Sequence, residues 1–384
     1  MGDAVLVEAD PIEAARRLAR DFARDASAHD REGTFPFANF DVLHAAGLLR
    51  LTVSRAAGGQ GAGLDVARRV VTEVARGEPS TALVLAMHLT SHAAIARGDA
   101  WPVPLARRLT DSLRTGPALV NRLQVEHEAG SPSYGALPQT RAVRTEAGWR
   151  ITGRKRYATG APLLAWLVVS AVTDEGAPRL GSFVVPSGAP GVSIIETWDT
   201  IGMRATGSHD VAFDGVAVAA DHAIELRPAA EGTRPDPFGS VWFMGLTGAV
   251  YDGIARAARD DAVSFARRFA PSTLGAPLSS VPHIQQAVGA MEVLLETNDR
   301  LLGSLAVDAS AARPASTTAP LVRLVVIENA IRAVDLALEI AGNHGLAIGG
   351  ALERLHRDVI CGRTHPPGAA LVRQTAAARI LAEA

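Results

Sequence analysis

The spacing of apolar residues along the chain changes twice. Up to about residue 115, apolar side chains recur three or four positions apart, as at Ala15, Leu18 and Phe22, which predicts successive amphipathic helices. Short apolar runs such as Leu164 to Val169 follow, separated by glycine, proline and aspartate, and these predict antiparallel strands. Helical spacing returns after residue 236. The pattern therefore predicts a helical domain over residues 1–115, a β domain over 116–227 and a second helical domain over 228–384.

The last third of the chain carries the longest helical patterns. They predict helices over residues 238–269, 281–307, 314–342 and 370–384. Small residues such as Gly253 and Ala257 indicate close contacts between helices, as in a bundle. We therefore predict an α+β multi-domain fold with an N-terminal helical domain, a central antiparallel β domain and a C-terminal four-helix bundle.

A stretch near the middle of the chain combines a strand pattern with candidate chemistry. Apolar and polar residues alternate from Trp149, and Gly153 predicts a turn, so we expect a hairpin whose second arm ends in Tyr157-Ala158-Thr159-Gly160. This end suits a planar ligand, because an aromatic ring stacks, a hydroxyl forms one directed hydrogen bond and glycine permits close approach. The same pattern also fits a plain hairpin with a buried aromatic residue.

Composition and charge narrow the classes of function. The chain has 384 residues, a hydrophobic share of 48% and a formal net charge of -2, so it has no basic field that would attract nucleic acid. No run of apolar residues is long enough to predict a membrane span, and the first residues lack a secretory signal pattern. The single cysteine, Cys361, fits a reducing cytoplasm. We expect small molecules or other copies of the chain as partners.

Two further patterns invite a ligand-binding interpretation. Gly58 to Gly63 is rich in glycine, but no strand precedes it and no Gly-Lys-Ser/Thr follows, so a connection between helices is the better interpretation. In the next predicted helix, His88 and His92 lie one turn apart with Ser91 beside them. These side chains could line a ligand pocket or simply be satisfied within the core. No third metal ligand is evident, and we predict no metal site.

Several motifs in a fixed order resemble the acyl-CoA dehydrogenase superfamily of flavoproteins, over nearly the whole chain. They include Trp149 to Gly160, the run Thr200-Ile201-Gly202-Met203-Arg204-Ala205-Thr206-Gly207-Ser208, and Gly342-Asn343-His344-Gly345. Further matches are Gly47 to Val53 with the Gly-Gly-Gln-Gly that follows, Gly253 to Ala258, and Glu353 to Asp358. The order of helical, β and helical domains agrees with the same resemblance.

The resemblance implies a flavin cofactor and the residues that hold it. In this superfamily the flavin ring packs on the β domain, where Tyr157 and Thr159 occupy the matching positions, and Ser131 matches a flavin or substrate contact. The turn with Asn343 and Gly345 resembles a segment that reaches the flavin nucleotide in a neighbouring subunit, which implies a homodimer or homotetramer. FAD and FMN both remain open, because the usual arginine before Phe-Gly or Leu-Gly is shifted or lost here.

The main departure from the superfamily concerns the catalytic base of the dehydrogenases. That glutamate removes a proton beside the thioester carbonyl, and it usually follows the Arg-Asp pair by a few residues. Here His365-Pro366-Pro367 takes its place. The helical position that some members use instead lies in Val241-Trp242-Phe243-Met244-Gly245, which also lacks an acid.

A histidine at this position resembles the reduced-flavin monooxygenases of the superfamily, such as the dibenzothiophene-desulfurising enzymes. In those enzymes a histidine helps to form and hold a flavin hydroperoxide, because a hydrogen-bond donor stabilises the developing charge. The resemblance implies that His365 serves the oxygen step, that His88, His92 and Ser91 orient the substrate, and that a separate reductase supplies reduced flavin. Phe243 and Met244 are candidates for the lining of the substrate pocket.

Two other interpretations remain open from sequence. The chain could be an acyl-CoA dehydrogenase with a displaced base, for which Glu126, Glu128 and Asp252 are the candidates. It could also be a scaffold that keeps the fold and binds a partner or an acyl group without turnover.

Overall fold

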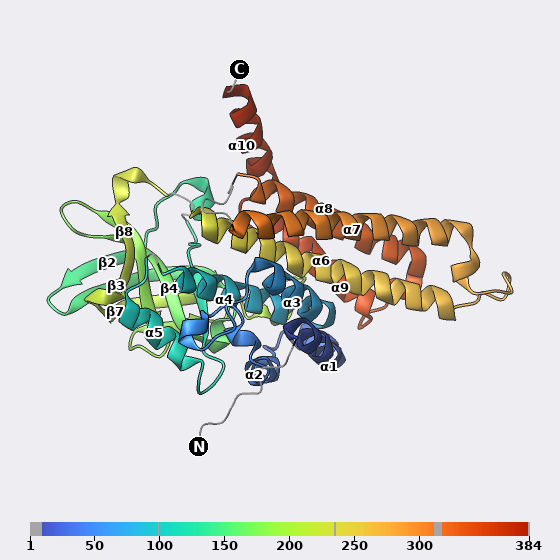
Figure 1. Ribbon diagram of the computed structural model, residues 1–384, viewed down its shortest axis with the longest axis horizontal. Helices are drawn as coiled ribbons and strands as arrows, with labels where there is room; N and C mark the ends of the chain where they lie inside the picture. Colours follow the sequence, from blue (N-terminus) through green and yellow to red (C-terminus); the bar gives the residue numbers. More distant parts are fainter. Residues whose placement is uncertain (1–9, 99, 129, 234–235, 311–316, 383–384) are drawn as a thin grey trace.

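The computed structural model describes residues 10–382 apart from 99, 129, 234–235 and 311–316. Figure 1 shows a β domain at one end of the molecule and long helices that extend from it to the other end. The ends of some predicted segments lie outside the described residues. They are residues 1–9 of the segment 1–115, residues 314–316 of the helix 314–342 and residues 383–384 of the helix 370–384. Among the described helices, none is long and apolar enough to cross a membrane.

Five α-helices lie among the described residues of the first part of the chain. They are α1 (Pro11–Glu32), α2 (Phe37–Ala45), α3 (Leu64–Gly77), α4 (Pro79–Arg97) and α5 (Val103–Ser112). Helix α4 begins at a proline, and the carboxylate of Glu78 accepts hydrogen bonds from the backbone N–H groups of Ser80 and Thr81. Such a cap satisfies N–H groups that have no partner within the helix. It fixes the start of the helix that carries both candidate histidines.

Among the described residues in the middle of the chain, eight strands form one sheet. They are β1 (Leu119–Leu123), β2 (Arg141–Thr145), β3 (Gly148–Ala158), β4 (Leu164–Thr173), β5 (Arg179–Pro186), β6 (Val192–Ile195), β7 (His209–Ala219) and β8 (Ala223–Pro228). Their order is β6-β7-β3-β2-β4-β5-β8, with β1 paired to β4. Most pairs are antiparallel, as predicted, but β1 and β2 both run parallel to β4.

The predicted turn at Gly153 is wrong. Residues Gly148–Ala158 form one continuous strand, β3, and the hairpin lies instead between β2 and β3, across Glu146 and Ala147. A Cβ atom on Gly153 would lie 2.8 Å from the backbone Cα atom of Thr140. Glycine is therefore required here because two backbones approach closely, and this signal resembles a turn signal in the sequence.

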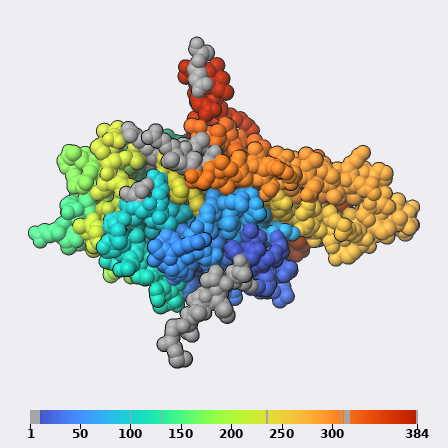
Figure 2. All heavy atoms as spheres, in the orientation of Figure 1, coloured from blue at the N-terminus to red at the C-terminus, as the bar shows by residue number. Residues whose placement is uncertain are grey.

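Long helices form the last part of the chain. They are α6 (Pro237–Arg268), α7 (Pro282–Ser310), α8 (Ala319–Ala341), α9 (Ala351–Ile360) and α10 (Ala369–Ala382). Helices α6, α7, α8 and α9 pack as a bundle (Figure 1), so the predicted four-helix bundle is present. Its fourth helix is α9, which is not among the helices predicted from sequence, and not the helix predicted over 370–384, which corresponds to α10. Helix α10 projects from the body of the molecule, as Figure 2 shows, and Val372 is its buried residue.

The three parts share one hydrophobic core. A single cluster of buried residues includes Leu85 of α4, Val169 of β4 and Val250 of α6. Helix α3 packs closely on α6, since a Cβ on Gly253 would lie 2.5 Å from the carbonyl oxygen of Thr72. Sites at the junctions between the helices and the sheet are therefore held rigidly.

Candidate functional site

Tyr157 forms an exposed aromatic platform at the end of β3. Its backbone has a φ of 55°, which is a left-handed conformation that costs a non-glycine residue on the order of 1–3 kcal/mol. The residue as a whole is 49% exposed, the Arg156 guanidinium lies 4.9 Å from the ring centroid, and Trp198 meets the ring edge-on at 6.2 Å. Backbone strain that presents an aromatic ring to solvent is typical of a functional position.

Thr159 lies beside this platform within a network of polar groups. Its hydroxyl is 3.0 Å from the Ser208 hydroxyl, which is 2.8 Å from that of Thr206. The Asn121 side chain on β1 donates to the Thr159 carbonyl at 3.0 Å. Asn121 is not among the site residues predicted from sequence, although an asparagine inside the apolar strand β1 is a usable signal.

The loop that contains Ser131 is fixed by a buried ion pair. Glu126 and Gly130 exchange two backbone hydrogen bonds of 3.1 Å, and Ser131 itself is buried. The Glu126 carboxylate lies 2.5 Å from the Lys155 ammonium and accepts from Thr140. Burial alone would raise the Glu126 pKa, but Lys155 and the hydrogen bonds outweigh it and lower the pKa. The loop is therefore anchored by a charged carboxylate.

All three carboxylates considered as a displaced base are engaged elsewhere. Glu126 is held as described, and Glu128 is exposed and accepts a hydrogen bond from Gln139 at 2.8 Å. Asp252 is buried and pairs with Arg256 at 2.7 Å, while Asn298 donates to its other oxygen at 3.2 Å. Each carboxylate thus has a partner that reduces its availability as a base.

His88 links three segments of the chain. Its Nε2 atom lies 2.8 Å from the carbonyl oxygen of Leu49, and its Nδ1 atom accepts the Val120 N–H at 3.2 Å. Burial lowers its pKa to about 4, so the ring is neutral. Both ring nitrogens are used by backbone groups. His88 therefore positions α4 against β1, and this arrangement leaves it no free atom for a substrate.

His92 differs from His88 because it has no hydrogen-bond partner among the described residues. The two rings lie 4.6 Å apart, and both nitrogens of His92 are buried without a partner. Burial, His88 and Arg50 lower its pKa well below the usual value. The Ser91 hydroxyl donates to the Met87 carbonyl of its own helix at 2.9 Å. Of these three residues, His92 keeps the unused polar atoms that a ligand could satisfy.

The start of α6 meets the end of α4. Arg97 pairs with Asp236 at 3.1 Å, and the indole nitrogen of Trp242, on the second turn of α6, is buried without a partner among the described residues. Phe243 is partly buried and lies under the guanidinium of Arg323, 5.7 Å from its ring centroid. Met244 belongs to the buried core. Phe243 is therefore the better placed of the two predicted substrate residues.

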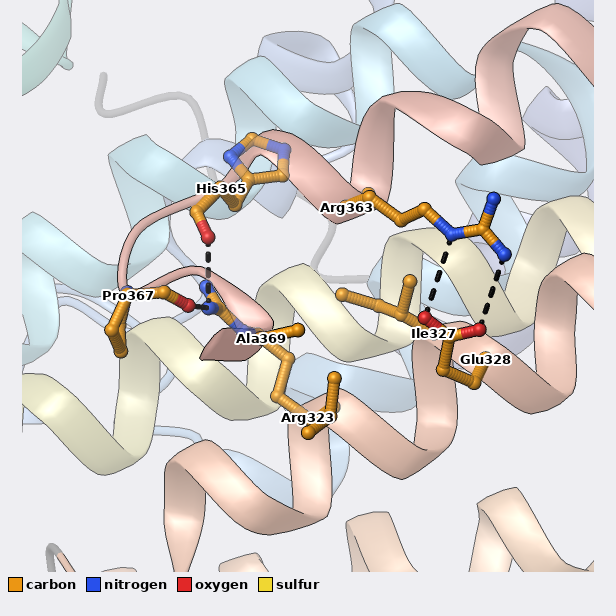
Figure 3. Close-up of a pocket in the computed structure, with 9 residues that line it drawn as sticks. Arg323, Ile327, Glu328, Arg363, His365, Pro367 and Ala369 are labelled. Carbon is orange, nitrogen blue, oxygen red and sulfur yellow. Dashed lines mark hydrogen bonds and ion pairs between the residues drawn. The ribbon is translucent and has the colours of Figure 1, made fainter. Parts of the chain in front are cut away.

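His365 lies on the segment between α9 and α10, and this segment is held by Arg323 of α8. The buried Arg323 guanidinium donates to the carbonyl oxygens of His365 at 3.1 Å, Pro366 at 3.1 Å and Pro367 at 2.8 Å. Figure 3 shows the His365 carbonyl directed at Arg323 and the imidazole ring directed away from it. A small cavity of about 20 Å³ lies between α8 and this segment.

The His365 ring also contacts helix α6. Its Nε2 atom is 2.6 Å from the hydroxyl of Tyr251, which is completely buried. Burial and the positive charge of Arg323 lower the His365 pKa to about 3. The imidazole is therefore neutral near pH 7. Sequence reasoning missed Tyr251 and Arg323, and no local pattern marks either residue as a partner of His365.

The predicted nucleotide contacts lie far from His365 within one chain. Asn343 is exposed and Gly345 is buried in the short helix η9 (Gly342–Leu346) after α8. Arg323 lies near the other end of α8, about 27 Å away at 1.5 Å per residue. The turn therefore does not belong to the group of residues around His365 in the same chain.

These residues fit a flavin. An exposed aromatic face at Tyr157, the hydroxyl of Thr159 and the positive φ of Gly160 supply stacking, a directed hydrogen bond and close backbone approach. The unpartnered nitrogens of His92 add polar groups that a ligand could satisfy. A Cβ on Gly160 would lie 2.9 Å from Val84 of α4. The end of β3 therefore lies directly against the helix that carries His88 and His92.

Comparison with known proteins supports this assignment. The acyl-CoA dehydrogenase N-terminal domain matches residues 10–98, the middle domain matches 125–216 and the C-terminal domain matches 245–366. The chain is 33% identical over 354 residues to YdbM of Bacillus subtilis (strain 168), whose name assigns it provisionally to the acyl-CoA dehydrogenases, with 91% of each chain covered. The predicted fold and the predicted family are both confirmed.

Other relatives carry different names. L-evernosamine nitrososynthase of Micromonospora sp. is 31% identical over 88% of this chain and 82% of its own, and dibenzothiophene monooxygenase of Mycolicibacterium goodii is 30% identical over 67% and 63%. The structure of KijD3 in complex with FMN and a dTDP-linked amino sugar superposes with a TM-score of 0.84 at 28% identity, covering 98% of this chain and 96% of KijD3. The chain therefore belongs to the acyl-CoA dehydrogenase family, and it is a flavin-dependent oxidoreductase.

Proposed function

We propose that this chain is a reduced-flavin monooxygenase that acts on a small organic substrate. The observation that carries the proposal is His365, a neutral imidazole in the segment where the sequence resemblance leads us to expect the glutamate base of the dehydrogenases. When bound, reduced flavin supplies two electrons to dioxygen, so that one oxygen atom enters the substrate and the other leaves as water. The names of the nitrososynthase and dibenzothiophene monooxygenase relatives support oxygen chemistry.

Each residue of the proposed site has a separate role. Tyr157 stacks on the flavin ring, and Thr159 donates a hydrogen bond to its edge. The loop anchored by Glu126 and Lys155 brings Ser131 to the cofactor. His365 acts as a neutral hydrogen-bond donor in the oxygen step, because its low pKa keeps it from carrying charge near pH 7. His92 contacts the substrate, while His88 and Ser91 position α4, the helix that carries His92.

Phe243 and Met244 belong to the proposed substrate pocket. The partly buried ring of Phe243 supplies an apolar wall, and Met244 supports it from the core. We propose FMN as the flavin, because the KijD3 complex contains it. Reduced FMN from a separate flavin reductase would then reach the site in the cytoplasm, and Asn343 and Gly345 would complete the site in a neighbouring subunit of a homodimer or homotetramer.

Peroxide release tests the role of His365. We expect His365→Ala to oxidise reduced FMN with increased release of hydrogen peroxide and less oxygenated product, because a lost donor leaves developing charge unstabilised. A panel of dibenzothiophene and dTDP-linked amino sugars supplies the trial substrates. Unchanged peroxide release together with unchanged product would overturn the assignment.

Acyl-CoA dehydrogenation is the second candidate, because YdbM is similar over 91% of this chain. Anaerobic addition of acyl-CoAs of different chain length to the flavin-loaded protein distinguishes the two functions. Bleaching of the flavin absorbance supports the dehydrogenase, and an unchanged spectrum supports the monooxygenase. A protein that does not retain flavin in either redox state would be the non-catalytic scaffold.

A further inference from the structure

Tyr251 and His365 are distant in sequence, but their side chains are in hydrogen-bond contact. The two residues are 114 positions apart, and the Tyr251 hydroxyl lies 2.6 Å from the His365 Nε2 atom. Tyr251 is completely buried on α6, whereas His365 is partly exposed. No described residue forms a hydrogen bond with His365 Nδ1. One nitrogen of the imidazole is therefore paired inside the protein, and the other is available to a ligand.

The direction of this hydrogen bond follows from the charges of both groups. Burial, followed by the nearby Cys361 and Asp358, raises the Tyr251 pKa well above its usual value, so the phenol keeps its proton. Burial and Arg323 keep the imidazole neutral. If His365 donated to the phenol oxygen, the phenol proton would need another acceptor, and the described residues provide none. A buried donor without an acceptor is destabilising, so the phenol donates to Nε2.

The surroundings of Tyr251 leave little room for another arrangement. A Cβ on Gly362 would lie 3.2 Å from the Tyr251 ring and 2.8 Å from the Ile327 side chain, so this part of the segment is packed tightly on both helices. The Arg323 guanidinium donates to the backbone carbonyl oxygens of His365, Pro366 and Pro367. Figure 3 shows the carbonyls of His365 and Pro367 directed at it. The backbone and one ring nitrogen of His365 are thus fixed independently.

We propose that Tyr251 is a positioning residue that fixes His365 as the Nδ1–H tautomer, with Nδ1–H left without a partner among the described residues. The purpose of this arrangement rests on the proposed monooxygenase function, since a fixed donor would stabilise charge that develops on oxygen. The tautomer itself is a property of the chain without flavin. An Nδ1–H donor also needs no proton from solvent at the moment of reaction.

Nitrogen NMR of flavin-free protein labelled with ¹⁵N-histidine tests the tautomer directly. We expect His365 to give a pyrrole-type Nδ1 signal and a pyridine-type Nε2 signal, assigned by their loss in His365→Asn. In Tyr251→Phe we expect this pattern to change to a mixture of tautomers. Thr247→Val is the matched control, because it removes another buried hydroxyl from α6, one that bonds to its own helix at 2.6 Å. A pyrrole-type Nε2 in the wild type, or an unchanged pattern in Tyr251→Phe, would overturn the proposal.

Substitutions of His365 by amides supply a second test. An asparagine amide occupies the place of Nδ1, and a glutamine amide occupies the place of Nε2. We expect product formed per reduced FMN consumed to fall in the order wild type, His365→Asn, His365→Gln, and Tyr251→Phe to lose roughly three- to tenfold, the value of one hydrogen bond. If glutamine preserved coupling better than asparagine, the proposed direction would be wrong.

The two hypotheses fail in different ways. If NMR shows the Nδ1–H tautomer and its loss in Tyr251→Phe, but His365→Ala changes neither peroxide nor product, the proposed function fails and the positioning role stands. If His365→Ala uncouples the reaction but the tautomer is Nε2–H, the proposed function stands and the positioning role fails.

Discussion

Burial controls the charge of the Asp358 side chain. Its carboxyl is buried on α9 and accepts the Met203 N–H at 2.5 Å, and burial raises its pKa to about 7. Because the folded pKa lies above the unfolded value, its contribution to stability is fully present below about pH 4 and is lost as the pH rises through about 7.

We therefore expect Asp358→Asn to be more stable than the wild type at pH 8, by on the order of 2–4 kcal/mol. The difference in the free energy of unfolding shrinks as the pH falls toward 4, where the wild-type carboxyl is already protonated. Urea denaturation between pH 4.5 and 8 measures this difference. The exposed Asp199→Asn serves as a control with little expected change, and a variant less stable than wild type at pH 8 would contradict the account.

The buried ion pair between Lys155 and Glu126 gives a second prediction about single residues. Both side chains are buried, and they lie 2.5 Å apart beneath the Ser131 loop. We expect Lys155→Met alone to lower the free energy of unfolding by about 3–5 kcal/mol, because it leaves a buried carboxylate unpaired. Adding Glu126→Gln to Lys155→Met recovers part of this loss, since the uncompensated charge is removed. Strictly additive losses in a urea-denaturation double-mutant cycle would show that the two side chains do not interact.

Among the elements, the close contact of α3 and α6 depends on one glycine. A Cβ on Gly253 would lie 2.5 Å from the Thr72 carbonyl and 2.6 Å from the Ala75 Cβ, whereas Gly289 in α7 has nothing within 4 Å. We expect Gly253→Ala to destabilise the protein by about 1–3 kcal/mol through overpacking. Gly289→Ala is the matched control and stabilises by roughly 0.5–1 kcal/mol through helix propensity. Thermal unfolding of both variants checks the opposite signs, and a stabilised Gly253→Ala would be inconsistent with the packing.

The elements also show which parts of the structure could be predicted from sequence. The change from helical to strand spacing is local, so the order of helical, β and helical parts was predictable. The strand end at Tyr157 was recognised for the same reason. Gly153 was misread as a turn, because close backbone approach and a turn both select glycine.

Pairings between distant segments could not be predicted from local patterns. The partner of His365 is 114 residues away on α6, and Asn121 reaches Thr159 from another strand. His88 and His92 have the same helical signal, yet one is satisfied by backbone groups and the other has no partner among the described residues. The packing of α4 against Leu49 and against β1 distinguishes the two histidines.

At the scale of the whole molecule, the turn after α8 carries exposed apolar residues. Ile348 is 93% exposed, and Leu346 is also exposed beside the predicted nucleotide contacts. If this turn reaches a neighbouring subunit, Ile348→Asp is expected to shift sedimentation toward smaller species and to weaken FMN binding. Val103→Asp, at an exposed position on α5, is the control. Unchanged sedimentation and FMN affinity in Ile348→Asp would place the subunit contact elsewhere.

The oxygen reaction of the bound flavin tests the central claim most directly. Anaerobic protein loaded with reduced FMN is mixed with oxygenated buffer in a stopped-flow instrument, and flavin absorbance is followed for the wild type and His365→Ala. A monooxygenase is predicted to give two resolved phases, and His365→Ala is predicted to lose the separation between them. A single wild-type phase that matches free reduced FMN and does not change in His365→Ala would contradict the claim.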